Sequence, residues 1–231
     1  MKVEIHSHTD KYSPCSKIPP HELVQMAEAS GYDALFITDH NRVWPDRDLR
    51  GLKELCARMR IFPAIEISLP NRHDMLVLGA ENPVYESMTR AEEVLAQACA
   101  DGYLTALAHP FRYHSELPQY SMLADALEVR TCNHSDPAHL EAASAYAREH
   151  NVAEVYASDA HGLNFMNKFW IETEAPFATP QEFRRLIVSG QYKNRTRNFD
   201  MPLPPPYRVA TMAELTEDDL MSLCVEPAAL K

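Results

Sequence analysis

Short apolar runs alternate with amphipathic stretches along most of the chain. Residues 33–38 and 103–108 have the length and aliphatic content of buried strands, whereas residues 20–30 place apolar side chains at helical spacing. Gly31 follows where this predicted helix should end. The same pattern predicts further strands at residues 2–6, 61–67, 75–79, 126–131 and 153–157, and further helices at residues 49–60, 89–101, 137–150 and 179–190.

Repeated strand–helix units of this length indicate an α/β fold with a largely parallel sheet, either doubly wound or closed into a barrel. No glycine-rich phosphate loop follows any predicted strand, which favours the barrel. From about residue 200 the sequence becomes rich in proline, as in residues 201–208. We therefore expect a single barrel domain at residues 1–200. Residues 201–231 would form a tail, with a short helix at residues 214–223, that packs on the domain or on a partner.

Charge and composition narrow the class of partner. The 231 residues include 22 basic and 33 acidic ones, a formal net charge of −11, which argues against a long nucleic acid as partner. No run approaches the roughly 20 apolar residues that span a bilayer, and residues 1–10 lack the apolar core of a signal peptide. Five scattered cysteines without a CxxC pair favour a reducing compartment. We expect a cytoplasmic protein without a membrane partner, and the oligomeric state stays open.

Histidines and carboxylates recur where the predicted strands end. His6 and His8 lie at positions i and i+2, so their imidazoles project to the same side of an extended segment. A predicted turn at residues 69–72 would return His73 to the end where Glu66 lies. The whole set is His6, His8, His40, Glu66, His73, His109, Asp159 and His161. Because active sites of parallel α/β folds form where the strands end, this set predicts a site for two or three divalent ions.

The ordered motifs resemble those of the PHP (polymerase and histidinol phosphatase) family, in its small stand-alone phosphoesterase branch. They are His6-x-His8, ITDHN at residues 37–41, Glu66, His73, AHPFR at residues 108–112 and SDAH at residues 158–161. The resemblance covers residues 1–162. It implies a distorted (β/α)7 TIM-like barrel with a di- or trinuclear metal site that hydrolyses phosphoesters.

The resemblance also implies how the ions are held. One ion would be held by His6, His8, Glu66 and Asp159, a second by His40 and His161, and a third by Glu66, His73 and His109. Asp39 and Asn41 would orient the ligand imidazoles. Family members usually carry an acidic residue or a histidine a few positions after HxH, and Asp10 is the candidate for that ligand here, although it comes early. The ions would be Zn, Mn or Fe.

The predicted activity is that of a metal-dependent phosphoesterase acting on a small phosphomonoester or a nucleotide-type phosphoester. A hydroxide held by the ions would attack phosphorus, with Asp159 and His161 as catalytic residues. His161 or a metal-bound water would protonate the leaving oxygen.

Three arginines are candidates for binding the phosphate of the substrate. Arg112 is the best candidate, because it directly follows the AHPF run. Arg42 and Arg130 are weaker candidates. A guanidinium matches phosphate oxygens in a bidentate way. His114 and His134 are further candidates for contact with the substrate, whose identity the sequence leaves open.

Two other functions compete with this one. An amidohydrolase-type barrel also begins with HxH, but many such enzymes use a carboxylated lysine as the bridging ligand. None of the seven lysines lies at the middle strand ends, where Glu66 lies instead. A catalytically silent metal-binding module that docks through the proline-rich tail is the other alternative.

Overall fold

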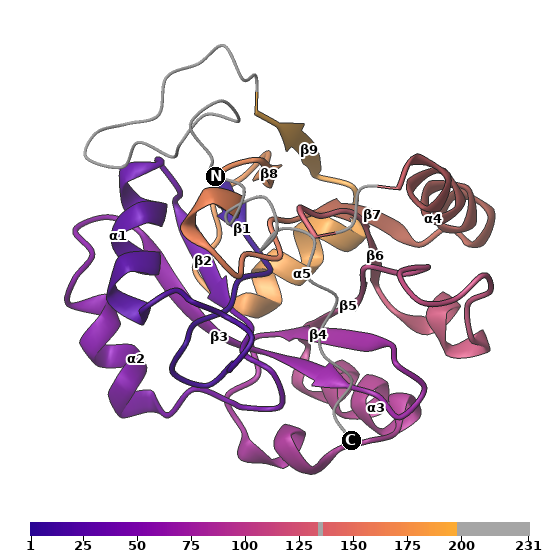
Figure 1. Ribbon diagram of the computed structural model, residues 1–231, viewed down its shortest axis with the longest axis horizontal. Helices are drawn as coiled ribbons and strands as arrows, with labels where there is room; N and C mark the ends of the chain where they lie inside the picture. Colours follow the sequence, from indigo (N-terminus) through magenta and orange to yellow (C-terminus); the bar gives the residue numbers. More distant parts are fainter. Residues whose placement is uncertain (134–135, 198–231) are drawn as a thin grey trace, which may run out of the picture.

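Nine strands form one sheet in the computed structural model, which describes residues 1–133 and 136–197 (Figure 1). The strand order is β7-β6-β5-β4-β3-β2-β1-β8-β9. The strands are β1 (Lys2–Glu4), β2 (Ala34–Ile37), β3 (Arg60–Ser68), β4 (Asp74–Leu78), β5 (Leu104–Ala108), β6 (Ala126–Arg130), β7 (Ala153–Tyr156), β8 (Phe169–Thr173) and β9 (Tyr192–Thr196). The helices are α1 (Pro20–Ala29), α2 (Asp46–Lys53), α3 (Ala91–Asp101), α4 (Pro137–His150) and α5 (Pro180–Val188), with short 3-10 turns at η1 (Pro83–Ser87), η2 (Gln119–Leu123) and η3 (Leu163–Phe165).

The sheet is mixed and curls into a nearly closed barrel. Strands β1, β2 and β3 are parallel to one another, as are β5, β6 and β7, whereas β4 is antiparallel to both of its neighbours. Strands β8 and β9 add an antiparallel hairpin beside β1. The far edges meet through side chains: Tyr192 Oη and Asn194 Nδ2 on β9 donate to the Glu154 carbonyl on β7, at 2.7 and 2.8 Å. The α/β barrel prediction holds, but these strands are not seven identical strand–helix units.

Alternation along the strands separates an inner core from the packing of the outer helices. Phe62 and Ala64 on β3 face the inner core, whereas Ile65 and Ile67 pack outward with α3. Phe183 and Ile187 of α5 complete the inner core. Figure 1 shows α5 in the middle of the view, while α1, α2, α3 and α4 lie around the periphery. Helix α5 therefore closes one end of the barrel, and the other end is left for polar groups.

Helix ends follow local capping signals. Asp136 accepts a hydrogen bond from the Ala138 amide at the start of α4, and Asn151 ends that helix in the left-handed region. Thr179 and Glu182 form a capping box at the start of α5.

Helix α2 is shorter than the predicted helix at residues 49–60. It covers Asp46–Lys53, and Arg60 already begins β3. The Glu28 carboxylate of α1 accepts hydrogen bonds from the amides of Ala57 and Arg58, at 2.8 and 2.9 Å. This long-range contact fixes the segment as a loop, despite apolar residues at helical spacing.

Some predictions fall outside the described residues, namely His134, the helix at residues 214–223 and the tail at residues 201–231. Among the described residues, no helix combines the length and the apolar character that crossing a membrane requires.

Replacing Phe36 with alanine should lower the free energy of unfolding by about 3–5 kcal/mol, because the fully buried ring packs between two other aromatic rings. The centroid of Phe36 lies 5.0 Å from that of Phe62 and 5.1 Å from that of Phe183. Urea denaturation followed by circular dichroism measures the loss. Leu55→Ala is the control, since Leu55 is 45% exposed and its truncation should cost about 0.5 kcal/mol or less. Equal losses in the two variants would contradict this assignment of the core.

Candidate metal centre

Four carboxylates extend the inward-facing rows of the strands at the open end of the barrel. Glu66 continues the row of Phe62 and Ala64 on β3, and Asp74 begins the row of Leu76 and Leu78 on β4. The set is Glu66, Asp74, Glu128 and Asp159. Strand periodicity therefore directs Glu66, Asp74 and Glu128 into one enclosed space, and Asp159 joins them from the turn after β7.

Imidazoles reach the same space from the turns that follow the strands. His6 and His8 follow β1, His40 follows β2, and two more follow β5 and β7. His109 has φ 31 and Asp159 has φ 47, conformations that residues other than glycine adopt at a cost of about 1–3 kcal/mol. Strained backbone in the turns after β5 and β7 is typical of functional sites, where the direction of a side chain matters more than local stability.

The Glu66 carboxylate lies at the centre of the imidazoles. Its Oε2 atom is 3.3 Å from His6 Nε2, 3.2 Å from His8 Nε2 and 3.1 Å from His40 Nδ1. The other oxygen, Oε1, is 3.2 Å from His109 Nε2. One fully buried carboxylate thus faces four imidazole nitrogens.

Asp159 takes a similar place on the opposite side of His6 and His8. Its Oδ1 atom lies 3.3 Å from the Nε2 atom of each of these two histidines and 3.4 Å from His161 Nδ1. The two Nε2 atoms are themselves 3.0 Å apart. Glu66 and Asp159 therefore enclose the His6–His8 pair.

These short contacts are not directed as hydrogen bonds. Glu66 Oε2, both Asp159 carboxylate oxygens and His40 Nδ1 are buried without a hydrogen-bond partner. Buried polar atoms are rarely left in this state. Neighbouring ligand atoms of a tetrahedral zinc ion, at bonds of about 2.0–2.1 Å, lie roughly 3.3 Å apart. The unpartnered atoms and their spacing fit residues that hold divalent ions.

Four overlapping groups have ligand atoms within 4.8 Å of one another. They are His8–His40–His161, His6–Glu66–His109, His6–His8–Asp159 and His40–Glu66–Asp74. Every predicted ligand except His73 belongs to at least one group. Because the groups share residues, the arrangement suits a cluster of ions better than a single one.

His73 lies outside all four groups, contrary to the expectation from sequence. Its ring stacks on His114 at 4.2 Å and contacts Tyr120 edge-on at 6.5 Å. Burial, with neighbouring histidines, lowers the pKa of His73 to about 4. The register explains the displacement: Asp74 shares the inner face of β4 with Leu76, so His73 is one residue out of phase. The predicted turn and returning strand are present, but they bring Asp74 to the cluster.

Glu128 orients the imidazole that lies deepest in the cluster. Its Oε1 atom is 2.8 Å from His6 Nδ1, and its Oε2 atom accepts a hydrogen bond from the His109 amide at 2.8 Å. Such a carboxylate fixes the tautomer of a ligand histidine and raises its basicity. Sequence reasoning missed Glu128, although a lone carboxylate two residues after Ala126 in an apolar strand was the available signal.

Asp39 and Asn41, which we expected to orient imidazoles, instead fix the surrounding loops. Asp39 accepts hydrogen bonds from the Thr9 amide and hydroxyl and from Trp44 Nε1, at 2.7, 2.6 and 2.8 Å. Asn41 Oδ1 accepts a hydrogen bond from the Ser68 amide at 2.9 Å.

The loop after HxH places Ser13, and not Asp10, beside the cluster. Ser13 Oγ is 3.4 Å from His8 Nδ1 and accepts a hydrogen bond from the His40 amide at 2.9 Å. Asp10 is exposed and belongs to none of the four groups. Asn133 is a further contact that the sequence did not suggest, with Nδ2 3.0 Å from His161 Nδ1.

One of the three predicted phosphate-binding arginines reaches the cluster. Arg112 Nη1 lies 3.9 Å from Asp159 Oδ2, and its side chain is 26% exposed. Arg42 instead pairs with Glu86 at 3.0 Å, and the Arg130 guanidinium lies 5.6 Å from the centre of the Tyr156 ring.

Charges within the cluster balance one another. Although burial opposes ionisation, His40 and His6 hold the pKa of Glu66 well below its usual range, and His6 and His161 do the same for Asp159. Burial also opposes a charge on His8, but the carboxylates of Asp159 and Glu66 beside its ring outweigh burial and raise the pKa of His8 to about 9. The metal-free cluster therefore holds protons at neutral pH where a metal ion would bind.

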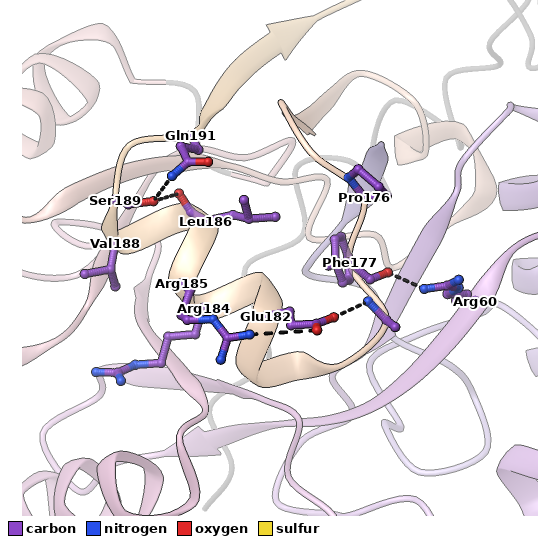
Figure 2. Close-up of a pocket in the computed structure, with 11 residues that line it drawn as sticks. Arg60, Pro176, Phe177, Glu182, Arg184, Arg185, Leu186, Val188, Ser189 and Gln191 are labelled. Atoms are coloured by element: carbon purple, nitrogen blue, oxygen red, sulfur yellow. Dashed lines mark hydrogen bonds and ion pairs between the residues drawn. The ribbon is translucent and has the colours of Figure 1, made fainter.

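A cavity of about 860 Å³ lies at the opposite end of the barrel (Figure 2). It is lined by α5 and the loop before it, together with Arg60 at the start of β3. Its cationic groups already have partners: Arg60 donates to the Phe177 carbonyl, and Arg184 pairs with Asp125 at 2.8 Å. The cluster, and not this cavity, carries the candidate chemistry.

A family model described as PHP-associated matches residues 137–192, a segment that contains Asp159 and His161. A two-domain protein from Bacteroides vulgatus ATCC 8482, containing a predicted PHP-like metal-dependent phosphoesterase, has a similar structure. Its TM-score is 0.67 at 14% identity, over 85% of this chain and 64% of that chain. A candidate metal-dependent phosphoesterase from Bifidobacterium adolescentis ATCC 15703 gives 0.54 at 16%, over 69% and 87%. The family model covers less than half of the chain, so these matches establish a shared fold.

A protein of another name has a similar fold. An amidohydrolase from Chromobacterium violaceum, solved with bound sulfate and no metal, has a TM-score of 0.52 at 14% identity, over 70% of this chain and 88% of that chain. The chain spans less than two thirds of the length of the Bacteroides protein. No curated protein matches the sequence. At these identities the structures establish the fold of this protein, and its activity is a separate question.

Metal binding to this protein should release protons, because a divalent ion must displace the proton from His8, whose pKa is about 9. The affinity for Mn²⁺ or Zn²⁺ should therefore rise from neutral pH to about pH 9, by up to about tenfold per pH unit for each proton displaced. Isothermal titration calorimetry in two buffers of different protonation enthalpy counts the protons. Binding that is independent of pH and buffer would contradict a protonated His8 in the metal-free cluster.

Glu128→Gln should weaken metal binding by roughly 10–100-fold, because the His6 imidazole loses its anionic partner. Competition with a fluorescent chelator measures the affinity. Glu92→Gln is the matched control, since Glu92 is 62% exposed on α3 and should leave the affinity unchanged. An affinity of Glu128→Gln equal to that of the control would show that Glu128 does not act on the cluster.

Proposed function

We propose that this protein is a metal-dependent phosphoesterase that hydrolyses a small phosphomonoester or a nucleotide-type phosphoester at a cluster of two or three divalent ions. The observation that carries the proposal is the fully buried Glu66 carboxylate, whose Oε2 atom faces three imidazole nitrogens and makes no hydrogen bond. A carboxylate in this position would hold divalent ions, because a buried and unpartnered oxygen contributes nothing to the stability of the fold. The candidate ions are Zn, Mn and Fe.

The four groups of ligand atoms suggest how the residues are divided among the ions. His6, His8 and Asp159 form one position, and His8, His40 and His161 form another around the same His8 ring. Glu66 and His109 extend the cluster away from His161. Divalent ions bound there would supply positive charge for the phosphoryl oxygens and lower the pKa of a water to about 7.

Arg112 is suited to hold the phosphate at the edge of the cluster. Its guanidinium lies 3.9 Å from Asp159, on the buried side, while 26% of the side chain remains open to solvent. A guanidinium in this place can exchange a weak ion pair for two hydrogen bonds to phosphate oxygens. Arg112 would then orient the substrate, and Asp159 would hold both the arginine and the cluster in place.

His161 is better suited to hold an ion than to donate a proton. Burial and the neighbouring charge of His8 lower the pKa of His161 to about 4, so its imidazole is neutral at physiological pH. A neutral imidazole offers a lone pair, which is what metal coordination requires. We therefore revise its expected role from protonating the leaving oxygen to binding a metal ion.

The acidic chain is compatible with an anionic substrate only through the cluster. The formal net charge is −11, and the cluster itself contains several carboxylates. Two or three divalent ions add about +4 to +6 at the point where phosphate would bind. This local charge favours a small phosphorylated molecule over a long nucleic acid, which would need an extended basic surface.

An amidohydrolase activity is the second candidate, because one of the similar structures carries that name. Many such barrels bridge their ions with a carboxylated lysine, but the four ligand groups among the described residues contain no lysine. Lys2, for example, donates to the Ser30 carbonyl at 2.8 Å, away from the cluster. Glu66 provides the bridging carboxylate instead.

The test combines elemental analysis of protein purified without chelator with a panel of phosphomonoesters, nucleotides, amides and lactones, assayed with added Mn²⁺ or Zn²⁺. We expect two or three divalent ions per chain and turnover of phosphoesters only. Asp159→Asn should lower kcat by at least about 100-fold, because it removes charge that positions the cluster.

Asp46→Asn is the matched control, since Asp46 is 75% exposed on α2 and should leave kcat unchanged. Phosphoester hydrolysis that survives Asp159→Asn would rule out the proposed site. Turnover of amides or lactones without phosphoesters would favour the amidohydrolase. Tight metal without any turnover would favour a non-catalytic metal-binding module.

A further inference from the structure

Asp74 enters the cluster from β4, a strand that is antiparallel to both of its neighbours, β3 and β5. Its partners in register are Ser68 on β3 and Ala108 on β5, the residues next to the turns that carry the other ligands. The side chain is 16% exposed and shares the inner face with Leu76. Strand pairing therefore fixes Asp74 at the open end of the barrel, beside Glu66 and His109.

A cation beside Asp74 would relieve the repulsion between Asp74 and Glu66. Ligand atoms of Asp74, Glu66 and His40 lie within 4.8 Å of one another, and Asp74 Oδ2 lies 4.0 Å from His109 Nε2. Two carboxylates this close in a buried site repel each other unless a positive charge lies between them. Glu66 Oε2 and His40 Nδ1 are buried, lie 3.1 Å apart and have no hydrogen-bond partner, so both atoms are available to bind a cation.

We propose that Asp74 is a metal ligand and that, with Glu66 and an imidazole from His40 or His109, it forms a position that prefers Mn²⁺ to Zn²⁺. The donor set contains two carboxylates and one imidazole, and oxygen ligands suit manganese. The position formed by His8, His40 and His161 contains imidazoles alone, which suit zinc or iron. The two ends of the cluster thus differ in chemistry and bind different ions. This inference rests on the metal centre of the proposed function and adds to it the identity of an ion.

His73 provides the matched control, because it is adjacent in sequence but faces away from the cluster. Its ring packs against His114 and Tyr120, and it belongs to none of the ligand groups. Removing the ligand should therefore lower the metal content, whereas removing its neighbour should leave it unchanged, although both changes fall at the same end of β4.

The experiment compares the wild-type protein with Asp74→Ala, Asp74→Asn and His73→Gln. Each protein is stripped of metal, loaded with equal amounts of Mn²⁺ and Zn²⁺, desalted and assayed by elemental analysis and by the electron paramagnetic resonance of bound Mn²⁺. We expect Asp74→Ala to lose about one Mn²⁺ per chain and keep its zinc, and His73→Gln to keep both metals. Asp74→Asn, which preserves the shape of the side chain, should bind Mn²⁺ at least about tenfold more weakly.

Circular dichroism checks that each variant is folded, and Asp74→Asn decides the question if Asp74→Ala is not. Full Mn²⁺ content in the folded Asp74 variants, or an equal loss in His73→Gln, would overturn the assignment. Phosphoester turnover by the same samples separates the two proposals. A wild-type protein that hydrolyses phosphoesters while the Asp74 variants keep their Mn²⁺ refutes this inference alone. Loss of Mn²⁺ from Asp74→Ala, with a wild-type protein that hydrolyses no phosphoester, refutes the proposed function alone.

Discussion

The buried charge of Glu66 is the constraint on which the rest of the structure depends. A carboxylate without solvent costs several kcal/mol unless cations or hydrogen-bond donors compensate it. The protein surrounds it with imidazoles from the turns after β1, β2 and β5, and these lower its pKa despite complete burial. Three separate strand ends must therefore be held together for the charge to be tolerated. Closure of the barrel satisfies this requirement.

One end of the barrel contributes apolar packing, and the other end carries the candidate metal ligands. At one end, Phe183 and Ile187 of α5 fill the space between the strands, and Phe183 packs against the Phe36 ring. At the other end, polar atoms of Glu66 and Asp159 are left unpartnered, and His109 and Asp159 adopt left-handed backbone conformations. Packing at the apolar end can offset the free-energy cost of unpartnered atoms and strained backbone at the polar end, because both ends belong to one continuous sheet.

A second layer of carboxylates supports the groups that face the cluster. Glu128 holds His6 and the His109 backbone together, and Asp39 joins Thr9 to Trp44 across the loops after β1 and β2. Neither residue contacts the centre of the cluster. Their hydrogen bonds restrict side chains that would otherwise rotate, so the ligand atoms can stay close before any ion binds.

The sequence by itself determined the chemistry of the site and the strand ends that carry it, because histidines and acids recurring after apolar runs are a local signal. It did not determine which side chains point inward. His73 and Asp74 differ by one residue, and only the pairing of β4 with β3 and β5 decides which of them faces Glu66. Glu128 was likewise hidden within an apolar strand. Side-chain direction in a strand depends on register, and register is set by contacts between residues far apart in the chain.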